Sequence, residues 1–245
     1  MKVEQACRFR LDVGYRTFDQ SEGFGPEQEK ELGEAFNDTM NSIFPRTGAS
    51  ILSCAVKRSN VFLARNTLRT DNHGRKTIFT HTYSMTIADY GKLMDTAPEK
   101  LLGIPMEQFL EYQTGSPLAT LDADMLSSGT MDARQLFEKY NLTSQRYKEL
   151  LAGAYEAITE GKPLCLKTDL SDDETEQMVR EIAYCVVLGL PAALKGRLSF
   201  SSGADTRMNL YTLAGPNMNA GAGDNVFGVE NPQYTRIHVR DAVTD

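Results

Sequence analysis

The sequence predicts an α+β fold: an antiparallel meander packed with helices, followed by a helix-rich second subdomain with a short hairpin. Residues 51–85 contain three apolar runs separated by turn-forming residues, and sequential strands of this kind usually pair with one another. Residues 132–189 instead place apolar side chains at the three- and four-residue spacing of helices. We therefore expect two domains, residues 1–128 and 129–245, divided at the turn-rich stretch near Ser128.

Residues 1–43 are predicted to form a strand, a loop and a helix. Residues 7–11 alternate between apolar side chains and arginine, which indicates a strand with one apolar side. A loop is expected after Leu11. The helix is predicted to begin near Pro26, because proline suits a first turn and acidic residues follow near the positive end of the helix dipole. Its expected core stripe consists of Leu32, Phe36, Met40 and Ile43.

A basic surface is expected on one side of the meander formed by residues 51–56, 61–69 and 76–85. With the second turn centred between Asn72 and His73, the core face holds Phe62, Ala64, Asn66, Phe79, His81 and Tyr83. The opposite face then carries Arg65, Thr67, Arg69, Lys76, Thr80 and Thr82. Arg65, Arg69, Arg75 and Lys76 make this face positive, and it could meet a nucleotide, nucleic acid or acidic protein. An ordinary solvated sheet face is the alternative.

The rest of the chain is predicted to be mostly helical. Short helices broken by prolines are expected between residues 87 and 125. The expected later elements are helices at 132–140 and 144–158, a strand at 163–167, a capped helix from Ser171 to Gly189, and a hairpin of 198–201 with 209–213.

Composition limits the possible functions. The four cysteines are widely spaced among 245 residues and the three histidines are scattered, which favours reduced thiols and predicts no zinc site. No stretch approaches the roughly 20 apolar residues of a membrane span, so we expect a cytoplasmic protein. The net charge of −7 argues against bulk binding to phosphate backbones. The glycine pattern matches no nucleotide fingerprint, and no cofactor is predicted.

His81 is the strongest single candidate for a catalytic side chain. Its imidazole stands beside Thr80 and Thr82 and could act as a general acid or base. A histidine held by hydrogen bonds within the core is the competing interpretation. Asp122 and Asp124 could offer two carboxylates to a magnesium ion, but a polar linker explains them as well.

A small-anion site is the second candidate. Ser201 and Ser202 could supply hydroxyls and amides, and Arg207 a guanidinium, with Asp205 between them. The loop of the predicted hairpin is the alternative explanation for this cluster.

Two passages carry a family resemblance. In residues 60–94, a strand places His81 two positions after Phe79 and leads into a short helix. In residues 179–213, a Leu-Pro stop leads through a basic turn into Leu-Ser-Phe-Ser at 198–201. The first passage resembles the amino-terminal domain, and the second the middle domain, of bacterial GTPase-associated proteins from multi-gene conflict systems. The resemblance implies an adaptor or effector-associated protein that works with a GTPase or other NTPase in anti-phage defence, and it assigns no catalytic residue.

Three functions follow as hypotheses. The first is a non-enzymatic interaction module that docks onto an NTPase or effector. The second is a hydrolase or nucleotide-processing enzyme that uses His81 with Asp122 or Asp124, or the loop at 201–207. The third is a sensor that binds a nucleotide or nucleic acid on the basic meander.

Overall fold

The structure is a mixed α+β fold, which confirms the predicted class. It is a computed structural model, and it describes residues 1–11, 14–36, 50–71, 73–112, 114–126, 129, 131–168, 172–203, 211–215 and 225–229.

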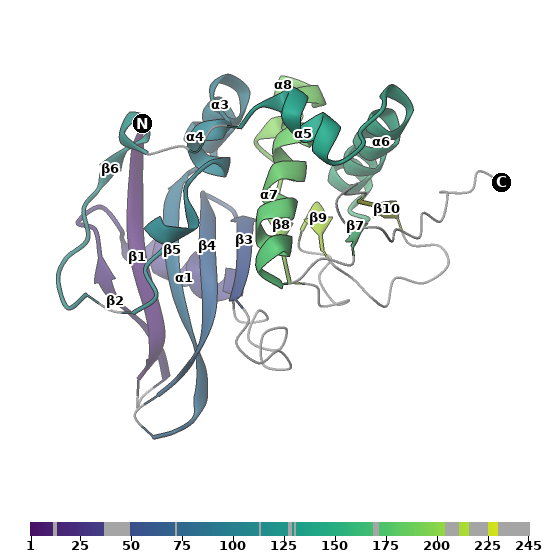
Figure 1. Ribbon diagram of the computed structural model, residues 1–245. Helices are drawn as coiled ribbons and strands as arrows, with labels where there is room; N and C mark the ends of the chain where they lie inside the picture. Colours follow the sequence, from purple (N-terminus) through teal and green to yellow (C-terminus); the bar gives the residue numbers. More distant parts are fainter. Residues whose placement is uncertain are drawn as a thin grey trace.

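One twisted sheet organises the described residues (Figure 1). Its strand order is β10-β7-β9-β8-β3-β4-β5-β1-β2, and the short β6 pairs with the start of β1. Neighbours are antiparallel from β2 to β8 and parallel from β8 to β10. The strands are β1 (Lys2–Leu11), β2 (Gly14–Gln20), β3 (Ser50–Val56), β4 (Asn60–Thr70), β5 (Lys76–Thr86), β6 (Leu121–Asp122), β7 (Leu164–Lys167), β8 (Phe200–Ser201), β9 (Leu213–Ala214) and β10 (Val226–Gly228).

Helices cover both sides of this sheet (Figure 1). The helices are α1 (Pro26–Phe36), α3 (Ile87–Thr96), α4 (Glu99–Leu102), α5 (Ala133–Lys139), α6 (Ser144–Glu160), α7 (Asp172–Gly189) and α8 (Ala192–Lys195), with 3₁₀ turns η1 (Met106–Gln108) and η2 (Ala123–Met125). We name the two sides the α1 face and the α7 face after the helices that pack on them. None of the described helices combines the length and apolar character needed to cross a bilayer.

Each face has its own apolar core. On the α1 face, Leu32 and Phe36 pack with Phe62 and Ala64, which confirms the first half of the predicted helix stripe. Met40 and Ile43 lie outside the described residues. On the α7 face, the larger cluster joins side chains of β3, β4 and β5 to the apolar side of α7.

The predicted division at residue 128 stays a prediction. The sheet crosses it, since β3 pairs with β8 through Ser53↔Ser201 and Cys54↔Phe200. The core of the α7 face also draws residues from both predicted parts, from Val3 to Val229.

The three strands of the meander are confirmed, but the predicted register is wrong by one residue. Arg65 pairs with His81, and Thr70 pairs with Lys76, so the turn is centred on His73. Gly74 supplies a positive φ of 75° in this turn. Because side chains alternate along a strand, a one-residue slip exchanges the two faces of β5 relative to β4. His81 therefore shares the α7 face with Arg65 instead of lying beside Ala64.

Two other expectations were wrong. The predicted loop after Leu11 contains β2, an edge strand whose side chains are mostly half-buried, so its apolar alternation is weak. The predicted hairpin at 198–213 is not antiparallel, because Phe200 and Leu213 are partners in a parallel ladder. Strand β9 also pairs in parallel with β7 through Leu164, and this tertiary pairing sets its direction. The expected helices at 132–140 and 144–158, the strand at 163–167 and the helix end at Gly189 are confirmed.

Residues 104–126, which we call the covering segment, run from the end of α4 across the α7 face to β6 and η2 (Figure 1). Gly103 directly precedes the covering segment. Its amide donates a hydrogen bond to the Glu99 carbonyl, and its carbonyl accepts one from the Gly129 amide. A Cβ at this position would lie 2.4 Å from the Glu99 carbonyl oxygen and 2.9 Å from that of Gly129.

Gly103→Ala is therefore expected to lower the free energy of unfolding by about 1–3 kcal/mol, the usual effect of overpacking against groups that cannot move. Urea unfolding followed by circular dichroism measures this change. Gly25→Ala is the matched control, because no atom lies within 4 Å of its Cβ position. Equal stability of the two variants would contradict the close approach at Gly103.

Candidate functional site

His81 lies on β5, fully buried, and packs edge-on against the rings of Tyr83 and Phe109 at centroid distances of 5.0 and 5.9 Å. The Leu110 amide donates to its Nδ1 at 3.2 Å. Burial lowers the pKa of His81 to about 4, so the imidazole is neutral near pH 7. Since Nδ1 accepts, the ring proton lies on Nε2, which has no hydrogen-bond partner within the described part of the chain.

Cys7 and Asp19 lie near His81, so the fold brings together three residue types that serve nucleophilic catalysis. Their environment opposes that chemistry. Burial, with a smaller effect of the Asp19 carboxylate, raises the pKa of the Cys7 thiol to about 12. The thiol therefore stays protonated. Asp19 itself accepts hydrogen bonds from Thr114 N at 2.6 Å and Gly115 N at 3.1 Å.

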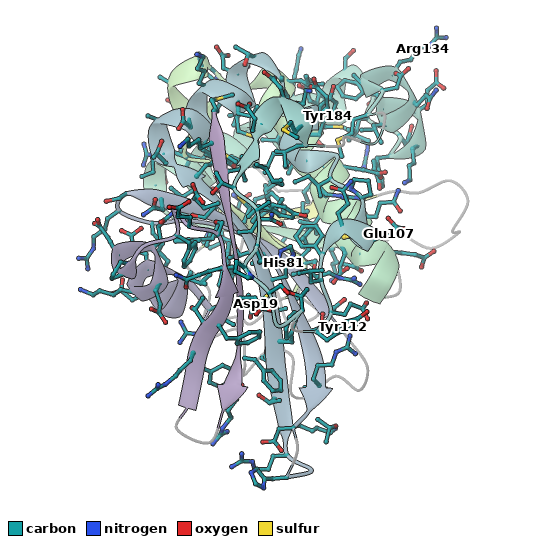
Figure 2. All side chains as sticks on the ribbon, turned by 90° about the vertical axis from the view of Figure 1, so that its left-hand side faces the viewer. Asp19, His81, Glu107, Tyr112, Arg134 and Tyr184 are labelled. Carbon is teal, nitrogen blue, oxygen red and sulfur yellow. The ribbon has the colours of Figure 1, made fainter. Side chains whose placement is uncertain are left out.

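Four polar side chains of the sheet share one role, because each forms a hydrogen bond with the backbone of the covering segment. Tyr83 donates its hydroxyl to Gln108 O at 2.9 Å, His81 accepts from Leu110 N, and Arg69 donates to Glu111 O at 3.1 Å. Asp19 then accepts from Thr114 and Gly115. In Figure 2, His81 and Asp19 lie within the molecule, while Glu107 and Tyr112 lie toward its right-hand side.

A charged network, buried at Glu176 and half-exposed at Glu111, fixes the same segment to α7. Arg65 forms ion pairs with Glu176 of α7 at 3.3 Å and with Glu111 of the covering segment at 3.5 Å. Ser50 donates to Glu176 at 2.5 Å and accepts from Arg65 at 3.1 Å. Arg69 completes the network with a 2.7 Å ion pair to Glu111.

The predicted basic surface is therefore partly covered. Arg65 is half-buried beneath α7 and the covering segment, and its charge and that of Arg69 meet the carboxylates of Glu176 and Glu111. Arg75 pairs with Asp71 at 2.6 Å, while Lys76 is exposed. Glu111 and Glu176 come from distant parts of the sequence, so the charge of residues 57–76 alone could not reveal them.

Asp122 and Asp124 have different surroundings. Asp122 caps η2, where its carboxylate accepts from Asp124 N at 3.1 Å and lies 3.4 Å from the amino group of Met1. The hydrogen bond from Asp124 N holds the pKa of Asp122 below its usual value. Across the described ranges, no group of three or more His, Cys, Asp or Glu side chains is arranged to hold a metal ion.

Ser201 and Ser202 are buried in the sheet. The Ser201 hydroxyl lies 2.9 Å from that of Ser53, and the Ser202 hydroxyl accepts from Leu52 N at 2.9 Å. Both side chains thus join β8 to β3. Asp205 and Arg207, the other members of the predicted anion site, lie outside the described residues.

Sequence reasoning missed Asp19, Glu111 and Glu176, which the structure shows to be the main acidic anchors of this region. The composition of residues 104–126 did offer a signal. They contain acidic residues but no lysine or arginine, which complements the basic face predicted for the meander. Comparisons with protein-family models, with curated proteins and with solved structures found no match.

The buried His81 is expected to make stability depend on pH. The unfolded imidazole takes up a proton near pH 6.5 and the folded one only near pH 4, so stability present above pH 6.5 is lost as the pH falls through this window. The loss is at most about 3 kcal/mol. Urea unfolding at several pH values should give a shallower dependence for His81→Phe than for the natural protein. Identical slopes in the two proteins would show that His81 does not titrate in this way.

Proposed function

We propose that this chain is a non-enzymatic interaction module, an adaptor or effector-associated protein that works in the cytoplasm with a GTPase or other NTPase in a bacterial conflict system. The resemblance of residues 60–94 and 179–213 to GTPase-associated proteins supports the choice of partner. The observation that carries the proposal is the role of His81, Asp19 and Arg69, which all bind the backbone of the covering segment.

The same observation weighs against the enzymatic alternative. A general base must reach the proton that it removes, within about 2.6–3.2 Å or through one water. His81 is fully buried, its Nδ1 accepts from Leu110 N, and its lowered pKa makes it a weak base near neutral pH. The nearby thiol of Cys7 is also buried and protonated.

The sensor alternative has less support for a different reason. A phosphate-binding surface needs cationic groups that a ligand can approach. Arg65 and Arg69 instead meet Glu111, and Arg75 meets Asp71. A nucleotide would have to displace these carboxylates.

Purification of the protein from its own host at low and moderate salt, followed by mass spectrometry, tests the proposal. We expect a GTPase or other NTPase in near-stoichiometric amount, and we expect the NTPase rate of that protein to change when this chain is added. The control is the same purification with an unrelated tagged protein. Turnover of a substrate by this chain alone, abolished by His81→Phe in a folded variant, would overturn the proposal.

A further inference from the structure

A row of four polar side chains, which we call the polar row, crosses the α1 face of the sheet. Thr17 of β2 pairs with Arg8 of β1. Arg8 pairs in turn with Thr80 of β5, and Thr80 pairs with Asn66 of β4. Direct partners in an antiparallel ladder present their side chains on the same face. The polar row therefore interrupts a face whose next member on β4, Ala64, belongs to the apolar core.

The Arg8 guanidinium fits into a notch in α1 that exists because residue 33 is glycine. A Cβ at Gly33 would lie 2.6 Å from Nη1 and 3.3 Å from Cζ of Arg8. Glycine inside a helix is less favourable than alanine, so this position gives up helix stability and gains room for the guanidinium. Arg8 is half-buried there, and within the described residues its side chain forms no ion pair and no hydrogen bond.

Two more polar atoms of the row are buried without a partner. Asn66 is fully buried, and neither its Nδ2 nor Thr17 Oγ1 has a hydrogen-bond partner within the described part of the chain. Thr80 donates its hydroxyl to Asn66 Oδ1 at 2.7 Å, so the free end of this amide is its donor end. Native proteins satisfy nearly all buried polar groups with protein, water or a ligand. The polar row thus offers unused donors to a group from outside the chain.

The unused donors lie over the same part of the sheet. Helix α1 packs on β4, where Leu32 joins Phe62 and Ala64 in one core cluster. The backbones of β1 and β4 are about 10 Å apart across β5. Since the Arg8 guanidinium contacts α1 at Gly33, its side chain extends over the sheet toward Asn66 and covers part of that distance.

The chemistry of these groups defines the ligand. Guanidinium and amide N–H groups only donate, so the ligand must accept, and a planar carboxylate matches a guanidinium through two parallel hydrogen bonds. Arg8 is the one cation of the polar row. Glu29 of α1 accepts from Thr17 N at 3.4 Å, and its carboxylate lies near enough to raise the pKa of Arg8, which burial lowers. This charge balance favours a monoanion over a doubly charged phosphate.

We propose that the polar row binds a small monocarboxylic acid. Arg8 pairs with the carboxylate, and Asn66 donates to a second oxygen of the acid, such as a keto or hydroxyl oxygen. Strand β2 is an edge of the sheet, so the half-buried Thr17 and Arg8 form the end of the row through which the acid enters. The site is independent of the proposed function, because the covering segment crosses the α7 face.

NMR titration of the ¹⁵N-labelled protein with sodium acetate and with sodium pyruvate tests the site. We expect acetate to shift the Arg8 Nε–H signal, and pyruvate to shift both this signal and the Asn66 side-chain amide. Both shifts should saturate, with pyruvate binding about tenfold more tightly because it makes the additional hydrogen bond. Sodium chloride and sodium phosphate at matched ionic strength are the control titrations.

Three variants assign the binding to the polar row. Arg8→Gln should abolish saturable binding, and Gly33→Ala should weaken it at least about tenfold, since its methyl group occupies the place of the guanidinium. Arg16→Gln, which alters an exposed arginine of the same sheet edge, should bind pyruvate as the natural protein does. Thermal unfolding of each variant checks that the fold is intact.

Two results overturn the proposal and leave the proposed interaction module standing. Shifts that rise linearly with pyruvate and match those of Arg8→Gln or of chloride would show that the polar row is only solvated. Tighter binding of phosphate than of pyruvate would overturn the assignment to a monocarboxylic acid.

Discussion

Replacing Glu176 with alanine is expected to lower the free energy of unfolding by about 3–5 kcal/mol, because it leaves Arg65 beneath α7 without its buried carboxylate. The Ser50 hydroxyl loses its acceptor in the same change. Urea unfolding followed by circular dichroism measures the effect. Glu111 also pairs with Arg65 but is half-exposed, so it can offset only part of the loss.

Two controls separate this prediction from a general effect of removing charge. Arg134→Ala breaks the exposed pair with Glu138 on α5 and should change stability by less than about 1 kcal/mol. The double variant Arg65→Met with Glu176→Met should recover much of the lost stability, since no unpaired buried charge remains. If Glu176→Ala were as mild as Arg134→Ala, the buried network would not hold α7 as described.

Asp19→Ala is expected to reduce stability by roughly 4 kcal/mol, because the carboxylate accepts three hydrogen bonds at about 1.5 kcal/mol or more each. Two come from Thr114, through its amide and its hydroxyl, and one comes from the amide of Gly115. Urea unfolding measures the change.

The matched control is Asp124→Ala, which removes an exposed carboxylate from the same segment but none of its anchors. It should leave thermal stability nearly unchanged. Asp19→Asn keeps one side-chain oxygen as an acceptor and should fall between the natural protein and Asp19→Ala. Equal stability of Asp19→Ala and Asp124→Ala would contradict the anchoring role of Asp19.

Local patterns in the sequence predicted several elements of the fold. The strand at residues 76–85 and the apolar helix ending at Gly189 are local features, and both were confirmed, while the predicted cap Ser171 lies outside the described residues. The predicted register of β4 against β5 was wrong by one residue. The register depends on whether the connecting turn is centred between two residues or on a single residue. The predicted direction of β9 was also wrong. That direction is set by pairing with β7, a tertiary contact that the local sequence does not contain.

The role of the polar side chains could not be predicted from local sequence. Asp19 and Thr114 are 95 residues apart, and Ser50 and Glu176 are 126 residues apart. His81 was identified as a notable side chain, and the alternative of a histidine held by hydrogen bonds within the core agrees with its burial and its bond from Leu110. Cys7 and Asp19 are neighbours of His81 only because β1 pairs with both β2 and β5, and the local sequence does not predict this pairing.

Amide hydrogen exchange, followed residue by residue by NMR, tests most directly whether side chains of the sheet hold the covering segment in place. The amides of Leu110, Thr114 and Gly115 lie outside helices and strands, but each donates to a side chain of the sheet. We predict that they exchange far more slowly than exposed loop amides, and that Asp19→Ala removes the protection at Thr114 and Gly115. Exchange at the rate of an unstructured peptide in the natural protein would contradict the account.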